Sequence, residues 1–169
     1  EYQVMAVDKN KITSFASEPV LIADDKNVKT FEAENFASKS DSAYKGFTGE
    51  GFVEISTSVN RNLSLKVTIE KPGFYSIDFR YANGNGPTNT ENKCALRTLK
   101  VDNKETGTVV FPQRGKNEWS NWGYSNSVKV YLPKGKHVVS LSFEDVDDNM
   151  NGTINQAMID NLRIIMLNE

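Results

Sequence analysis

The sequence predicts an all-β fold, a β-sandwich or jelly roll made of two antiparallel sheets. Apolar and polar residues alternate with the period of a half-buried strand along five segments: Leu63–Ile69, Tyr75–Tyr81, Leu99–Val101, Val128–Leu132 and His137–Phe143. Turn-forming residues separate them, at Lys71–Gly73, Asp102–Lys104 and Pro133–Lys136. No helical pattern is longer than about two turns. Short strands with one buried face and one wet face are typical of antiparallel sandwiches.

Three carboxylates lie in the first and last predicted strands. In Val28–Glu34, Glu32 and Glu34 share one face, because side chains alternate with period two. One face of the last strand carries a carboxylate among apolar residues: Met158, Asp160, Leu162 and Ile164. A carboxylate on an apolar face needs a partner. If the two strands are neighbours, the three acids converge on one cation, and oxygen ligands suit Ca²⁺. Alternatively, the Glu residues are solvated edge charges and Asp160 bonds to backbone.

Composition indicates one soluble globular domain. The chain has 169 residues and a formal net charge of −2, so it lacks the basic face of a nucleic-acid binder. The single Cys94 excludes an internal disulfide, and no apolar run reaches the roughly 20 residues that span a bilayer. We expect the β-sandwich over residues 28–169. Residues 1–27 are predicted to be a linker or the end of an upstream domain, with or without extra strands of their own.

Three polar stretches are too long to be simple turns. They cover residues 83–93, which are rich in Gly and Asn, residues 113–127, which hold both Trp residues, and the acidic, amide-rich residues 144–156. Long irregular loops of compact domains are more often functional than idle. These loops are the predicted location of a binding site.

Six motifs in order give the chain a resemblance to a known family. They are Phe31–Glu34, Gly46–Val53, Pro72–Tyr75 leading into Arg80–Gly84, Arg97–Asn103, Trp119–Trp122 with Leu132–His137, and Ile159–Leu162. Their sequence and order resemble carbohydrate-binding modules of family 35, which are related to family 6. The similarity runs from about residue 29 to residue 167. Family 35 fits better because of the Arg-Tyr-Ala-Asn-Gly segment and the asparagine-rich final loop.

The resemblance implies a function and a cofactor. Members of these families are β-sandwich jelly rolls that bind glycans without catalysis and are appended to secreted glycan-active enzymes. The implied partners are a polysaccharide or oligosaccharide and a covalently linked catalytic domain, and the implied location is extracellular, cell-surface or periplasmic. Family members hold a structural Ca²⁺ through residues that here are Glu32, Glu34 and Asp160. Backbone carbonyls near Thr48 to Glu50 are expected to complete the coordination.

The resemblance also places a sugar site in the loops at one end of the sandwich. A sugar needs an aromatic face for its C–H groups and polar groups for its hydroxyls. Trp119 is the aromatic candidate, with a half-buried packing role as its alternative, and Trp122 is the predicted core member of the pair. Asn83 is the amide candidate, with a turn role as its alternative. Family members often place a sugar-contacting Asn where this chain has Met158, so that contact has to come from elsewhere or is absent.

The acidic loop has three possible roles. Asp147 to Asn155 matches the start of an EF-hand loop, but its twelfth position is Met158 and a strand precedes it, so an EF-hand is not expected. Asp147, Asn149 and Asn151 could present oxygens to a second Ca²⁺ at the ligand site. Alternatively, Asp148 and Asn149 hydrogen-bond to sugar hydroxyls, or the segment is a solvated turn.

No arrangement of residues predicts catalysis. The lone His137 starts a strand and is expected at the surface, and Cys94 has no base to activate it. The acids of residues 145–148 crowd one loop instead of facing each other across a cleft. The prediction is therefore a Ca²⁺-stabilised carbohydrate-binding β-sandwich that is not an enzyme. The alternative is a structural or protein-interaction sandwich that keeps the Ca²⁺ but has lost the sugar site.

Overall fold

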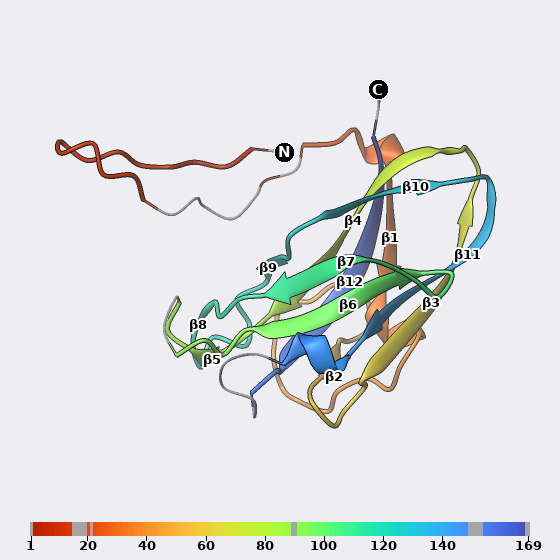
Figure 1. Ribbon diagram of the computed structural model, residues 1–169. Helices are drawn as coiled ribbons and strands as arrows, with labels where there is room; N and C mark the ends of the chain where they lie inside the picture. Colours follow the sequence, from red (N-terminus) through yellow and green to blue (C-terminus); the bar gives the residue numbers. More distant parts are fainter. Residues whose placement is uncertain (1, 15–19, 21, 89–90, 149–153, 168–169) are drawn as a thin grey trace.

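The computed structural model describes residues 2–14, 20, 22–88, 91–148 and 154–167, and it confirms the all-β sandwich (Figure 1). The first sheet has the order β1 (Val28–Glu32), β12 (Ala157–Met166), β4 (Gly73–Ala82), β10 (Val128–Leu132). The short β2 (Val53–Ile55) also pairs with β12, and β9 (Gly123–Tyr124) with β4. The second sheet has the order β3 (Asn62–Ile69), β11 (Gly135–Ser142), β6 (Ala95–Val101), β7 (Lys104–Phe111).

The remaining elements are short. A two-stranded ribbon of β5 (Asn85–Gly86) and β8 (Gly115–Lys116) lies at one end of the sandwich, opposite the β10–β11 connection (Figure 1). Helical structure in the described residues consists of the 3₁₀ turns η1 (Asp25–Asn27), η2 (Ala33–Asn35) and η3 (Asp145–Asp147). None of the described helices is long and apolar enough to cross a membrane.

The core forms because alternate residues of each strand face the opposite sheet. In β3 every second residue is buried, from Leu63 to Ile69, and the residues between them are exposed. Ile77 and Tyr81 of β4 face this row and are fully enclosed. Tyr81, at the end of the alternating segment Tyr75–Tyr81, is therefore a core residue. Burial of these apolar side chains is the main favourable contribution to the folding free energy.

Two strands of three or more residues, β7 and β2, were missed by the sequence pattern, as were the two-residue strands β5, β8 and β9. The first half of β7 is polar and contains Gly107, where a Cβ would lie 3.0 Å from Val128, so close approach to β10 favours glycine. The other, β2, has only three residues and is too short for a period to be recognised.

A β-bulge divides β12 into two parts. Residues 157–159 pair with β2, whereas residues 161–165 pair with β1, and the register against β4 shifts between Ile159 and Asn161. Asp160 is the extra residue at this shift, so it does not take part in the alternation that places Leu162 in the core. The prediction that Asp160 shares a face with Leu162 and Ile164 is therefore wrong, because the bulge changes the phase of the strand.

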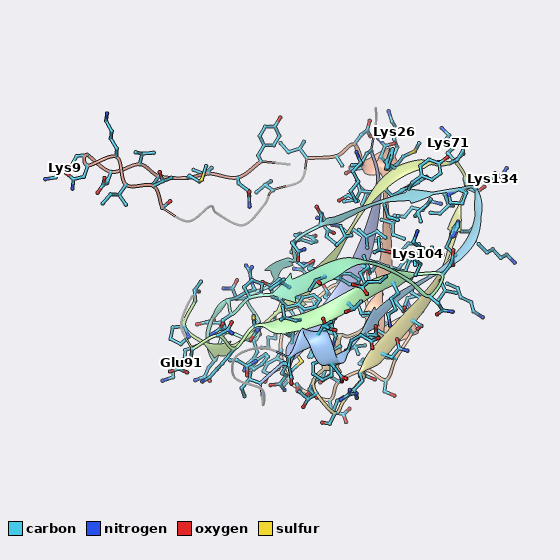
Figure 2. All side chains as sticks on the ribbon, in the orientation of Figure 1. Lys9, Lys26, Lys71, Glu91, Lys104 and Lys134 are labelled. Atoms are coloured by element: carbon cyan, nitrogen blue, oxygen red, sulfur yellow. The ribbon has the colours of Figure 1, made fainter. Side chains whose placement is uncertain are left out.

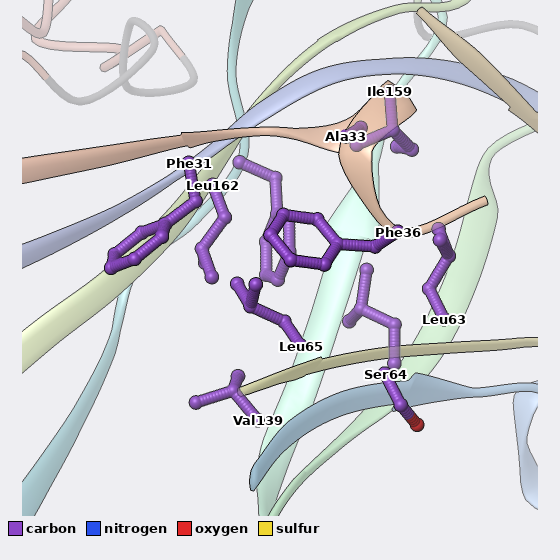
Figure 3. Close-up of a pocket in the computed structure, with 11 residues that line it drawn as sticks. Phe31, Ala33, Phe36, Leu63, Ser64, Leu65, Val139, Ile159 and Leu162 are labelled. Atoms are coloured by element: carbon purple, nitrogen blue, oxygen red, sulfur yellow. The ribbon is translucent and has the colours of Figure 1, made fainter. Parts of the chain in front are cut away.

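One apolar cavity of about 30 Å³ opens at the edge of the core near η2 (Figure 3). Phe31, Phe36 and Leu65 point into it, together with other apolar side chains from both sheets. The cavity has room for about one water molecule but offers almost no polar partner. We interpret it as a packing gap and not as a ligand site.

Residues 2–14 project from the sandwich and turn back at residues 9–10, with backbone hydrogen bonds between Asp8 and Ile12 and between Ala6 and Ser14 (Figure 1). It makes isolated bridges, Tyr2 with Val20 and Val7 with Thr13. Its apolar side chains are exposed: Tyr2, Val4, Met5, Val7 and Ile12. The predicted division of the chain at residue 27 stays a prediction.

His137 differs from its predicted surface position. Its side chain is only 8% exposed, and Nδ1 lies 2.7 Å from the Asp102 carboxylate in the β6–β7 turn, while Nε2 lies 2.9 Å from the Pro133 carbonyl oxygen. The Asp102 hydrogen bond raises the pKa of His137 above its ordinary 6.5, although burial opposes the shift. The same bond lowers the pKa of Asp102. The pair joins the β6–β7 and β10–β11 hairpins.

This pair gives the folding stability a pH dependence. Because the folded pKa of His137 is raised, its contribution is present below about pH 6.5 and is lost as the pH rises through the folded pKa. Between pH 6 and pH 9, the unfolding free energy should fall more in the wild type than in His137→Gln. The difference should be at most about 1 kcal/mol because Asp102 is half exposed. Urea unfolding at the two pH values measures it, and equal slopes for both proteins would contradict the assignment.

Candidate functional site

The three predicted acids meet at the loop of residues 44–50. Strand β1 ends at Glu32, and Glu34 lies in η2. The prediction that Glu32 and Glu34 share one strand face is therefore wrong. The loop nevertheless links the three carboxylates. The Thr48 backbone N–H donates to Asp160 Oδ1 at 2.9 Å, and its hydroxyl bonds to Glu32 Oε2 at 2.9 Å. The Glu50 N–H donates to Glu34 Oε1 at 2.7 Å.

Glycine at position 49 allows this close approach. Its φ is +63°, and a Cβ there would lie 2.4 Å from Glu34 Oε1 and 3.0 Å from Glu32 Cγ. Only a residue without a side chain fits between the two carboxylates in this left-handed conformation.

Arg80 of β4 neutralises part of the acidic charge. Its Nη1 forms an ion pair with Asp160, and its Nη2 donates to the Gly46 carbonyl oxygen at 3.1 Å. Burial raises the pKa of Asp160 even though Arg80 and Thr48 donate to it. Burial also raises the pKa of Glu32, and the neighbouring carboxylates raise it further against the Thr48 hydrogen bond. The site therefore holds more negative charge than its protein partners stabilise.

The donor set fits a divalent oxygen-seeking cation. Three carboxylates and one guanidinium carry a net charge of about −2 when ionised, which one Ca²⁺ would neutralise. Glu34 Oε2 and Asn161 Oδ1 are buried and have no hydrogen-bond partner within the protein. Within the described ranges, however, no three His, Cys, Asp or Glu side chains already surround a common point as metal ligands do.

A second cluster of aromatic side chains lies on the other side of the same loop. Phe52, Ala82 and Met158 form its buried base. Four partly buried aromatic residues pack on that base: Tyr44, Phe47, Trp119 and Trp122. Met158 therefore supports the cluster from beneath, at 1% exposure.

Trp119 is a half-buried member of this cluster, beside Tyr44. The two rings are nearly parallel, with centroids 5.8 Å apart and an interplanar angle of 14°. Gly84 lies against the indole, since a Cβ on Gly84 would be 2.8 Å from three ring atoms. Tyr44 was missed by sequence reasoning. The sequence feature that could have identified Tyr44 as a candidate is an aromatic residue within a polar run just before Gly46.

Trp122 is half-buried and not fully enclosed as expected of a core residue. Its ring packs on Phe52 with centroids 5.5 Å apart, and its Nε1 donates to the Lys45 carbonyl oxygen at 2.7 Å. The Arg80 guanidinium lies 5.6 Å from the centre of its ring. Trp122 thus holds the backbone of the loop.

Asn83 is completely buried and its amide is used within the protein. Its Nδ2 donates to the carbonyl oxygens of Lys93 and Phe111, and its Oδ1 accepts from the Asn85 backbone and side chain. This arrangement is that of a turn residue, the alternative role considered for it. The predicted sugar contact of Asn83 gains no support from this placement and stays a prediction.

The acidic loop is described in part. Asp147 is buried, and its carboxylate accepts from the backbone and hydroxyl of Thr98 and from the Glu144 backbone N–H. It therefore anchors η3 to β6. Asp148 is exposed, as a ligand contact requires. Asn149 and Asn151 lie outside the described residues, so their predicted roles remain predictions.

Part of the chain is similar in sequence to a curated protein, although no family model matches the chain. A curated cycloisomaltooligosaccharide glucanotransferase of Niallia circulans is 32% identical over 97 residues, which cover 57% of the chain. The match spans only 9% of that relative.

Solved structures are similar in fold to most of the chain. A cycloisomaltooligosaccharide glucanotransferase from Paenibacillus sp., complexed with cycloisomaltoheptaose, matches with a TM-score of 0.61 and 27% identity, over 83% of this chain and 18% of that one. A family 35 carbohydrate-binding module from an environmental isolate matches with a TM-score of 0.60 and 24% identity, over 80% and 91%. The protein is an antiparallel β-sandwich module. Its fold is that of family 35 carbohydrate-binding modules, as the sequence motifs predicted.

The acidic site leads to a prediction about stability. Asp160→Asn should lower the unfolding free energy by about 2–4 kcal/mol in EDTA, because it leaves the Arg80 guanidinium, whose side chain is 20% exposed, without its carboxylate. Glu32→Gln should cost less than about 1 kcal/mol, because it loses one hydroxyl hydrogen bond and relieves repulsion between like charges. Urea unfolding compares the two variants. Equal losses would show that the Arg80 pair does not stabilise the site.

Proposed function

We propose that this domain binds carbohydrate without catalysis, at the aromatic face formed by Tyr44 and Trp119. The observation that carries the proposal is the nearly parallel pair of rings at one end of the sandwich. Polar loops adjoin the rings, and they supply exposed groups such as Asn121 and Glu118. Aromatic faces stack on the C–H faces of pyranose rings, while amides and charges bond to hydroxyls.

The ligand we propose is an isomaltooligosaccharide, a chain of α-1,6-linked glucose. Two of the similar proteins bear the name cycloisomaltooligosaccharide glucanotransferase, and one of them was solved with cycloisomaltoheptaose. The chain would serve as an accessory module that holds a linked glycan-active catalytic domain on its substrate. That role implies an extracellular, cell-surface or periplasmic location.

A structural Ca²⁺ at Glu32, Glu34 and Asp160 is the second part of the proposal. The buried Glu34 Oε2 without a protein partner and the net negative charge of the site support it. When bound, the cation would neutralise the carboxylates and tie η2 and β12 to the loop of residues 44–50. In this proposal the three carboxylates bind the cation, and the His137 side chain is hydrogen-bonded to Asp102. We therefore assign neither the carboxylates nor His137 to general acid–base catalysis.

The alternative is a sandwich that keeps the cation site but binds no sugar. Met158 is buried at a position where family 35 modules often carry a sugar-contacting Asn, and this favours the alternative. Titration of the domain with isomaltooligosaccharides and a wider glycan panel, with and without EDTA, separates the two functions. No binding to any glycan by a folded, Ca²⁺-loaded domain would favour the alternative.

Substitution of Trp119 tests the sugar face. Trp119→Ala should weaken isomaltooligosaccharide binding by about 5- to 150-fold, which corresponds to about 1–3 kcal/mol for one aromatic contact at a binding hot spot. Tyr131→Ala is the matched control. Tyr131 is 55% exposed on β10, near Lys134 at the opposite end of the sandwich (Figure 2), so binding should be unchanged. Calorimetry measures both variants. Unchanged binding by Trp119→Ala would place the site elsewhere.

Substitution of Glu34 tests the cation. Ca²⁺ at about 100 times its dissociation constant should raise the unfolding free energy of metal-free protein by about 2.7 kcal/mol, because it binds the folded state. Glu34→Gln should lose most of this gain yet keep the stability measured in EDTA, since an amide oxygen can still accept from Glu50. Thermal unfolding with elemental analysis tests this. A melting temperature indifferent to Ca²⁺ in metal-free wild type would count against the cation site.

A further inference from the structure

One short loop joins the proposed cation site to the proposed sugar face. At its start, Tyr44 stacks beside Trp119. Only four residues further on, Thr48 bonds to two of the acids, through its backbone N–H and its hydroxyl. A seven-residue segment with contacts at both ends has little freedom to move at one end alone.

The middle of the loop is held by Arg80 and Trp122. The Arg80 guanidinium bonds to Asp160 with one nitrogen and to the Gly46 carbonyl oxygen with another. Trp122 Nε1 holds the neighbouring Lys45 carbonyl oxygen, and Gly46 lies against the indole with φ of +85°. Arg80 therefore connects a carboxylate of the cation site directly to the backbone two residues from Tyr44.

Without a cation, the carboxylates at this connection repel one another. Arg80 forms its ion pair with Asp160 and offsets only part of the charge, so repulsion among the three carboxylates favours conformations in which the loop and η2 separate. A bound cation would offset the repulsion, so that the Thr48 and Glu50 amides would stay against their carboxylates. A sugar that stacks on Tyr44 would then bind to a loop that is already ordered, so the loop would lose less conformational entropy when the sugar binds.

We propose that Arg80 and the loop of residues 44–50 couple the two sites, so that a divalent cation at Glu32, Glu34 and Asp160 strengthens isomaltooligosaccharide binding at Tyr44 and Trp119. Arg80 is a positioning residue in this scheme and contacts neither ligand. The inference rests on the proposed function. Thermodynamic linkage requires that the sugar raise the cation affinity by the same factor.

Calorimetric titration with cycloisomaltoheptaose tests the coupling. In wild type, the affinity should be about tenfold higher in Ca²⁺ than in EDTA, within the usual range of coupling between two sites. The affinity for Ca²⁺ should rise by the same factor when the sugar is present. Circular dichroism under the titration conditions establishes that the domain is folded in EDTA.

Two variants separate coupling from general stability. Arg80→Lys keeps the positive charge but has no fork to reach Asp160 and Gly46 together, so both ligands should bind with a coupling factor near one. His137→Gln weakens the opposite end of the fold and should keep the full coupling factor. Loss of coupling in His137→Gln would overturn the proposal, because the effect would then follow stability.

The outcomes distinguish the inference from the proposed function. Sugar binding of equal affinity in Ca²⁺ and in EDTA, together with a Ca²⁺-dependent melting temperature, would overturn the coupling and leave both sites standing. No sugar binding in either buffer would overturn the proposed function and the coupling with it. A reciprocal factor of about ten in wild type that is lost in Arg80→Lys would support the coupling.

Discussion

The β-bulge at Asp160 is the constraint on which the rest of the site depends. In a regular strand this carboxylate would face the apolar core beside Leu162, at a high cost in free energy. The bulge lets Asp160 and Asn161 together oppose Arg80, and it turns the carboxylate towards Arg80 and Thr48. At the same point β12 changes its partner from β2 to β1, and the chain between those two strands supplies the loop that meets the acids.

Both parts of the proposed function follow from that loop. It runs between the carboxylates of the proposed cation site and the Tyr44 and Trp119 rings of the proposed sugar face, and Arg80 contacts both its backbone and Asp160. The sandwich core, by contrast, needs only the alternation of its strands. A Ca²⁺ bound at the proposed site would therefore affect the geometry of one end of the domain more than the existence of the fold.

Much of this could be predicted from the sequence, because period-two alternation depends on residues alone. It located β3 and β10. The convergence of Glu32 and Asp160 was conditional on the first and last strands being neighbours, and the pairing of β1 with β12 meets that condition. It did not predict the bulge, which is set by the change of partner strands and not by local pattern. It also did not predict that Asn83 would be enclosed, or that Tyr44 would lie beside Trp119, since both depend on how distant loops pack.

A crystal structure of the domain with bound Ca²⁺ and cycloisomaltoheptaose would show whether one loop serves both sites. We expect anomalous density for Ca²⁺ among Glu32, Glu34 and Asp160, and a glucose ring on the face of Tyr44 and Trp119. We also expect Arg80 to remain bonded to the Gly46 carbonyl oxygen. Sugar bound at another face, or a cation site far from the loop of residues 44–50, would contradict the claim that one loop serves both.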